Sequence, residues 1–243
     1  MSSEKSQVEE QATGTEVEET SWSYPFSKAD VAAWKNEYGE DNIHLVELEE
    51  GNLYVMRGMF RKEFLTLQQS DFRNEEDLED NFVHRACLYP QLNIMTLRED
   101  MAATSNRLFE RLVQISNVDA QRTKEIVELT EKNLPANIDK ADYQGWKGRV
   151  KGSKIYIVEF ESKNFVYKGL KRSEYEKFRN KQREEGINQH DSENEVCTLA
   201  TLFPIPKEFD PNSDDYLYGT IGSLSLMIMK VSGFGSTSVV TKL

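Results

Sequence analysis

The stretch Ile155–Tyr175, IYIVEFESKNFVYKGLKRSEY, decides the fold, because the chain carries an earlier version of it. Ile43–Phe64 reads IHLVELEEGNLYVMRGMFRKEF, and it begins 112 residues before its counterpart (155 − 43). Ordered matches continue on both sides, with offsets from 111 (166 − 55) to 116 (224 − 108). Self-similarity of this kind indicates a tandem duplication, so we expect two similar lobes.

The densest matches follow the second apolar run of each copy. A basic residue and a glycine come first, and an arginine, a glutamate and an aromatic residue follow: Arg57, Gly58, Arg61, Glu63 and Phe64 in copy one, and Lys168, Gly169, Arg172, Glu174 and Tyr175 in copy two. Further on, Tyr89-Pro90 matches Phe203-Pro204. We expect Pro90 and Pro204 to end a helix, because proline lacks the amide that a helix needs.

Each copy predicts an α+β unit in which a β-hairpin is followed by three helices. The runs IYIVEF and FVYK are rich in β-branched and aromatic residues and flank a turn, which is typical of paired strands. A two-stranded hairpin is marginal by itself. The simplest remedy is a four-stranded antiparallel sheet in which the two hairpins meet edge to edge; separate lobes are the alternative.

The chain divides into five segments on composition and pattern. Residues 1–21 hold six glutamates and one lysine, and we expect a disordered acidic arm that serves as a solubilising tail or a docking segment. Residues 22–118 and 136–235 are the two lobes, and 236–243 is a frayed tail. Between the lobes, 119–135 predicts a linker helix that is capped by Asp119 and has Ile126 and Val127 inward.

Charge and cysteine content exclude several classes of function. The chain has a formal net charge of −12, which argues against nucleic acid as the main partner, because phosphate binding depends on clustered Lys and Arg. The densest basic stretch, Lys168–Arg183, is interpreted as a solvated helix face. The longest apolar run, Leu224–Val231, is far shorter than the about 20 residues of a membrane span. We expect Cys87 and Cys197 to be reduced core thiols in a cytosolic protein.

The sequence offers little reactive chemistry, so we expect no enzyme, no metal and no cofactor. It contains no HExxH or CxxC spacing for zinc and no glycine-rich phosphate loop. Three glutamates are shared between the copies, and paired carboxylates can perform acid–base chemistry. We interpret them as structural or exposed acids; they are Glu47, Glu49 and Glu63, with their counterparts Glu159, Glu161 and Glu174.

One helix carries more apolar residues than a single core requires. Beside the core stripe of Leu217, Ile221, Leu224 and Ile228, a second stripe runs at i, i+3, i+7 and i+10: Gly219, Gly222, Leu226 and Met229. Met227 adds adaptable packing beside it. Copy one has Ala103, Asn106, Glu110 and Val113 at those places. A helix that is apolar all round is either buried or covered by a partner, so these five residues are a candidate partner-binding face, with burial inside the protein as the alternative.

The second copy resembles a bacteriophage family. The residues that carry the resemblance are Tyr167-Lys168-Gly169-Leu170-Lys171-Arg172-Ser173-Glu174-Tyr175, Leu202-Phe203-Pro204 and Val231-Ser232-Gly233-Phe234. They look like the tail assembly chaperones of tailed phages, and among them the baseplate hub assembly proteins of large contractile-tailed phages. Copy one matches less well, because Asn117-Val118 stands where Gly-Phe is expected.

The resemblance implies a non-enzymatic late protein in the host cell cytoplasm. Such a protein holds a tail or baseplate hub protein during morphogenesis and is absent from the finished particle, with neither nucleic acid nor membrane as a partner. The alternatives are a structural component of the tail or baseplate and, much less favoured, a metal-dependent hydrolase or nuclease using Glu47, Glu49 or Glu159.

Overall fold

The computed structural model describes residues 22–48, 51–70, 72, 74–99, 102–118, 120–186, 188–204, 209–213 and 215–234. The predicted arm (1–21) and tail (236–243) lie outside these residues. So do Glu49 and Asp119.

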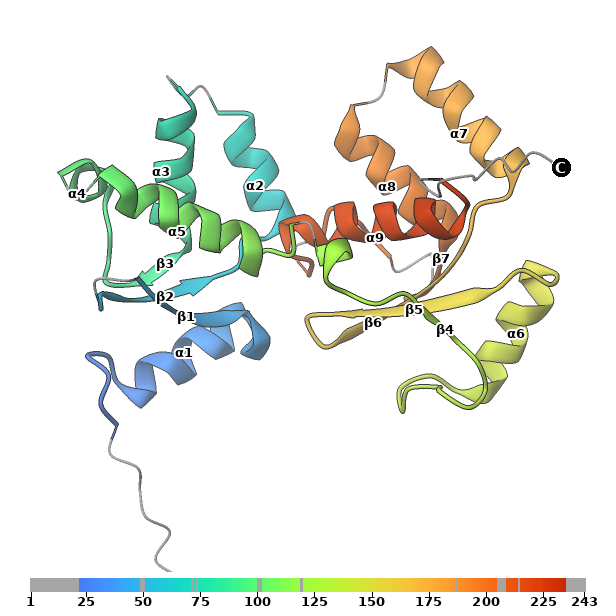
Figure 1. The fold of residues 1–243 in the computed structure, drawn as a ribbon, viewed down its shortest axis with the longest axis horizontal. Helices are drawn as coiled ribbons and strands as arrows, with labels where there is room; N and C mark the ends of the chain where they lie inside the picture. The colour runs from blue at the N-terminus through green and yellow to red at the C-terminus, as the bar shows by residue number, and fades with distance from the viewer. Residues whose placement is uncertain are drawn as a thin grey trace, which may run out of the picture.

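The two lobes lie side by side in Figure 1 and share the order of their elements, except that α4 of lobe 1 has no counterpart among the described residues of lobe 2. Lobe 1 contains α1 (Lys28–Tyr38), β1 (Ile43–Glu47), β2 (Leu53–Arg57), α2 (Arg61–Gln68), α3 (Glu75–Ala86), β3 (Cys87–Tyr89), α4 (Ile94–Glu99) and α5 (Ala102–Ile115). Lobe 2 contains α6 (Lys140–Val150), β5 (Ile155–Phe160), β6 (Lys163–Lys168), α7 (Arg172–Glu185), α8 (Gln189–Ala200), β7 (Thr201–Phe203) and α9 (Tyr218–Val231). The predicted α+β class is confirmed, and the predicted hairpin with three helices is present in lobe 2, whereas lobe 1 has the additional helix α4.

The two hairpins do not pair with each other, so the predicted joint sheet is wrong. One sheet has the order β1-β2-β3 and the other β4-β5-β6-β7, all antiparallel. The reason is that each hairpin gains its extra strands from nearby in the chain. β3 pairs with β2, β7 pairs with β6, and β4 (Val127–Glu128) pairs with β5, each on the edge away from the hairpin partner.

The segments before the two prolines are strands, where a helix running up to the proline was expected. Helices α3 and α8 end at Ala86 and Ala200, and three residues of strand follow in each copy. Both pairings contain an irregularity at the same place, between Val55 and Met56 and between Val166 and Tyr167. The Tyr89–Pro90 and Phe203–Pro204 peptide bonds are both cis.

The connection between the lobes is not the predicted helix. It contains a 3-10 turn, η2 (Ala120–Arg122), and then β4. Strand pairing with β5 replaces the helix, and the amide of Leu129 donates to the Ile155 carbonyl at 2.8 Å. Ile126 packs against the core of lobe 2, so the connector is built into that lobe.

In lobe 1, α2, α3, α4 and α5 lie on one face of the sheet and α1 lies on the other; in lobe 2, α7, α8 and α9 lie on one face and α6 on the other (Figure 1). The predicted core stripe of α9 is confirmed, with Ile221, Leu224 and Ile228 buried, and Leu108 and Leu112 are buried in the last helix of lobe 1. Lobe 2 also has a second buried cluster on its α6 face, around Trp146, Ile155, Ile157 and Leu129. The two lobes therefore share a plan and differ in how completely each is covered.

Candidate functional site

The repeated motif holds the start of each second helix against the preceding strand. In lobe 1, Arg57 donates two hydrogen bonds to the Glu63 carboxylate, at 2.8 and 2.9 Å. In lobe 2, the Lys168 ammonium donates to both oxygens of Glu174 at 2.9 and 2.8 Å. Partial burial opposes ionisation of Glu174, but the hydrogen bonds from Lys168 and Lys171 leave its pKa below the usual range. The matched basic and acidic residues are a structural pair.

The motif glycines let each hairpin approach the end of the last helix of its own lobe. A Cβ on Gly58 would lie 2.9 Å from the Ile115 carbonyl oxygen, and one on Gly169 would lie 3.0 Å from that of Val231. The residue directly after the helix, Ser116 or Ser232, accepts a hydrogen bond from the amide of Met59 or Leu170, at 3.0 or 2.7 Å. These contacts explain why Ile-Ser and Val-Ser recur at the two helix ends.

The basic stretch 168–183 does not form a patch around Lys168, which is paired with Glu174 as above. Along α7, Arg172 is exposed and pairs with Glu176 one turn later at 2.8 Å. Phe178 is buried, and Tyr175 lies against Phe234, with ring centroids 4.3 Å apart. The described part of α7 therefore has one core-facing side and one solvated side.

The two lobes meet in a seam that begins with backbone pairing. Phe60 of lobe 1 and Leu217 of lobe 2 form an isolated antiparallel bridge. The Arg61 amide donates to the Tyr216 carbonyl at 3.0 Å, and the Tyr218 amide donates to the Met59 carbonyl at 2.8 Å. Phe64 stacks on Tyr218 across the same boundary. The start of α2 thereby docks on the start of α9.

Arg61 is fully buried in the seam, with none of its surface exposed. Its guanidinium donates to the carboxylate of Glu193 at 3.1 Å and to the amide oxygen of Asn194 at 3.1 Å. It also donates to the carbonyl oxygens of His190 and Tyr218, each at 3.3 Å. All these acceptors belong to lobe 2. Arg61 is therefore part of the repeated motif and also connects lobe 1 to lobe 2.

Glu161 is a second seam residue, and the sequence did not reveal its position. Sequence analysis interpreted it as a structural or exposed acid, and the structure places it in the turn after β5 with φ 49°. Its carboxylate accepts hydrogen bonds from Asn117 at the end of lobe 1 and from Thr220 of α9. Burial raises the pKa of this carboxyl, although those hydrogen bonds oppose the shift.

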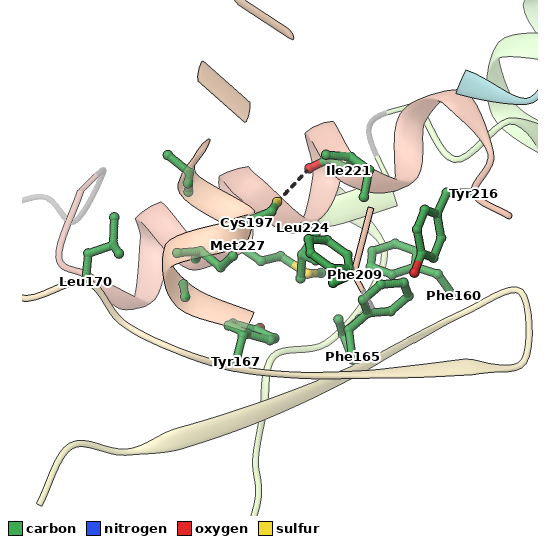
Figure 2. Close-up of a cluster of buried hydrophobic side chains, with 14 of the residues drawn as sticks. Phe160, Phe165, Tyr167, Leu170, Cys197, Phe209, Tyr216, Ile221, Leu224 and Met227 are labelled. Atoms are coloured by element: carbon green, nitrogen blue, oxygen red, sulfur yellow. Dashed lines mark hydrogen bonds between the residues drawn. The ribbon is translucent and has the colours of Figure 1, made fainter. Parts of the chain in front are cut away.

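The candidate partner-binding face is largely buried within the protein. A Cβ on Gly219 would lie 2.2 Å from backbone atoms of Asn117 and Val118, so this glycine permits the lobes to touch. Met227 is 1% exposed and lies among the core side chains beneath α9, near Tyr167 (Figure 2). Met229 is half-buried against the same core. Burial inside the protein, the alternative interpretation, accounts for Gly219 and Met227, because α9 serves as the central helix of lobe 2 and as its contact with lobe 1.

What remains accessible is a small hollow at the seam, with a volume of about 120 Å³. Leu226 stands at it with 52% of its surface exposed. Gly222 lines the hollow too, and a Cβ there would make only ordinary contact with Glu193, at 3.5 Å. Polar groups of the connector and of lobe 2 complete the lining, among them Gln121, Gln189 and Ser223. This seam hollow is the part of the predicted face that another molecule can reach.

A larger hollow of about 330 Å³ lies on another side of the seam. Its lining carries five carboxylates and one lysine: Glu37, Glu40, Asp41, Glu161, Asp215 and Lys163. The excess of negative charge disfavours anionic ligands such as phosphates. Glu47 and Glu159, the other shared acids, are exposed on the hairpins and do not line this hollow. Within the described parts of the chain, no group of three or more His, Cys, Asp or Glu side chains is placed to hold a metal ion.

Comparison of the chain with protein families, curated proteins and solved structures finds no match. No helix among the described residues combines the length and apolar character that crossing a membrane requires.

Proposed function

We propose that this protein is a non-enzymatic assembly chaperone for a phage tail or baseplate hub component. It acts in the host cytoplasm by covering an apolar segment of that component until assembly proceeds. The proposal rests on the resemblance carried by the Lys168–Tyr175 motif, Leu202-Phe203-Pro204 and Val231-Ser232-Gly233-Phe234. In the structure these residues serve to build the lobe, so they support a scaffold rather than a reaction centre.

The observation that carries the binding proposal is the exposed Leu226 beside the seam hollow. An apolar side chain of a client would pack on Leu226 and Gly222, and its neighbouring backbone groups would meet Gln121, Gln189 and Ser223. Full burial of one large apolar side chain contributes about 1.5–3 kcal/mol. A contact of this size gives weak, reversible capture, which suits a client that must later be released.

The test is capture of tail components by the tagged chain during infection, with mass spectrometry of what is bound. Leu226→Asp should abolish capture, because it places a charge in the apolar contact. Met95→Asp is the matched control, since Met95 is another exposed apolar helix residue (63%) in lobe 1, on α4. Capture that survives Leu226→Asp would remove the seam hollow as the binding site.

The composition of the mature particle decides between a chaperone and a structural component. A chaperone is present with the captured precursors and missing from purified particles. Recovery of the chain from purified particles in stoichiometric amount would refute the chaperone proposal and favour a permanent tail or baseplate component.

A further inference from the structure

The two sheets differ at the edge of the first hairpin strand, β1 or β5, that faces away from its hairpin partner. In lobe 2, β4 pairs with β5 in the register Val127↔Ile157 and Glu128↔Tyr156. The residue after β4, Leu129, is 1% exposed and belongs to the cluster on the α6 face. In lobe 1, no strand among the described residues pairs with the outer edge of β1. An open edge of this kind is a template for another extended segment.

The apolar surface beside that edge is also less covered in lobe 1. Trp146, Ile155 and Ile157 of lobe 2 are 4%, 1% and 9% exposed. Their counterparts by the constant offset of 112 are Trp34 and Ile43, which are half-buried, and Leu45, which is 46% exposed. Helix α1 contributes no buried residue, whereas α6 contributes Tyr143, Trp146 and Val150. Lobe 1 therefore lacks the cover that β4 and Leu129 give to lobe 2.

The offset of 112 also identifies a segment of the chain that can cover this surface of lobe 1. Helices α1 and α6 begin at Lys28 and Lys140 (140 − 28 = 112), so the same offset holds directly before the hairpins. Carried back without a gap, it aligns Val127-Glu128-Leu129 with Thr15-Glu16-Val17 of the acidic arm. The glutamate is identical, and an apolar valine stands at the position of Leu129.

We propose that residues 15–17 of the arm add to β1 as a fourth strand of the lobe 1 sheet. Val17 then covers Trp34, Ile43 and Leu45, as Leu129 covers their counterparts. The number of residues between this strand and the following helix equals that in lobe 2, so the connection already has a length that works. The tether gives the segment a high effective concentration at the edge, which favours it over a strand from another molecule. The arm's polar composition is no obstacle, because strand addition depends on backbone hydrogen bonds and alternate side chains.

An engineered disulfide tests the proposed register. By analogy with Val127↔Ile157, Thr15 lies opposite Leu45, so Thr15→Cys with Leu45→Cys should form an intramolecular disulfide. The control Glu9→Cys with Leu45→Cys lies six residues away on the same tether and should react about tenfold more slowly, since adjacent antiparallel residues are within disulfide reach. The native thiols do not interfere: burial raises the pKa of Cys87 to about 12 and also raises that of Cys197.

The linkage is read by mass spectrometry and by gel mobility without reductant. Equal rates for the two pairs would overturn the proposal, because tethering would then explain the reaction. A disulfide between two chains would overturn it as well, since the strand would come from a second copy.

Amide exchange gives an independent measurement without engineered cysteines. Because Leu129 bonds to Ile155, residues 155 and 157 direct their backbone groups to β4, and the counterparts on the open edge of β1 are Ile43 and Leu45. Val17→Asp should speed exchange at the Leu45 amide by about tenfold, since it exposes a hydrogen bond of the edge. Val8→Asp is the matched control in the arm, and the Ile157 amide is the internal reference. Unchanged Leu45 exchange in Val17→Asp, or an equal change in both variants, would refute the proposal.

Discussion

The two lobes use the same skeleton and differ in what covers it. Both have the basic–acidic pair after the second strand, the close glycine contact with the last helix, and the serine that accepts the next amide. Arg61 and Arg172 hold the same place in this skeleton, yet the side chain of Arg61 is fully buried and that of Arg172 is 91% exposed. Position in the repeat therefore determines where a residue lies in its lobe. Its burial and its partners depend on whether it also lies in the seam.

The seam is asymmetric, because the start of α2 in lobe 1 meets the start of α9 in lobe 2. An asymmetric contact between similar units can in principle continue with a third unit. Lobe 1 does not offer the receiving surface: Ala103 stands where Gly219 makes the close contact, and Glu110 stands for Leu226. Burial and the neighbouring acids Glu75, Glu76, Asp80 and Glu110 raise the pKa of Glu79, the counterpart of Glu193. The corresponding surface of lobe 1 therefore lacks the glycine and the leucine that lobe 2 presents, and it carries acidic side chains.

The strongest test of the comparison replaces each arginine in turn. Arg61→Met should destabilise the protein by about 3–5 kcal/mol, because Glu193 is left without its partner in a buried setting. Arg172→Met should give no change beyond the error of measurement, since that side chain is solvated. Both are measured by chemical denaturation followed by circular dichroism. Equal effects would mean that the seam does not distinguish the copies.

Glycines of α9 give the next largest contrast. Gly219→Ala should cost about 3 kcal/mol, because its Cβ would overlap the backbone of Asn117 and Val118. Gly222→Ala should instead stabilise the helix by about 0.5–1 kcal/mol, since alanine is the better helix former and finds only van der Waals contact there. Thermal unfolding of the two variants is the measurement, and a loss of stability in Gly222→Ala would contradict the helix–seam geometry described here.

The elements that the sequence predicts well are those with long periodic patterns. The hairpins, the following helices and the core stripe of Ile221, Leu224 and Ile228 all have enough residues to show their period. Strands β3, β4 and β7 are two or three residues long, which is too short for alternation to appear. Pairing with a hairpin edge, rather than local preference, makes them strands.

The candidate site was predicted only in part, for a different physical reason. The second stripe of α9 is visible in the sequence, but Gly219 and Leu226 look equivalent there. Gly219 is covered by residues 117 and 118, about a hundred positions earlier, and Leu226 is left open. Arg61 gave no separate signal either, because Arg172 repeats it. The pattern of apolar residues within one lobe does not reveal which of its residues contact the other lobe.

The serines at the helix ends should show a smaller difference between the lobes. Ser116→Ala leaves the buried Met59 amide without its acceptor and should cost about 1–2 kcal/mol. Ser232 is half-buried, so water can reach the Leu170 amide in Ser232→Ala and the loss should be smaller. Urea titrations of both variants provide the comparison. A larger loss in Ser232→Ala would reverse the expected order of burial.

The smallest expected effect concerns pH and belongs to lobe 1 only, where His44 holds the place of Tyr156. Burial lowers the pKa of His44, although Asp41 partly opposes the shift. Its Nε2 is buried and has no hydrogen-bond partner among the residues that the structure describes. A histidine whose pKa is lowered by folding contributes stability that is complete above its ordinary pKa of about 6.5 and is lost as the pH falls through its folded value. The unfolded chain then binds the proton more readily than the folded one.

His44→Gln removes this titration without adding volume, so its unfolding free energy should fall less than that of the parent chain between pH 7 and pH 5. The difference should stay below about 1 kcal/mol, because the ring is only half-buried and solvent screens the charge. Taking the difference between the two chains is necessary, since the raised pKa values of Glu79 and Glu161 act in the opposite direction and stabilise the folded state as the pH falls. Identical pH profiles for the two chains would show that protonation of His44 costs lobe 1 nothing.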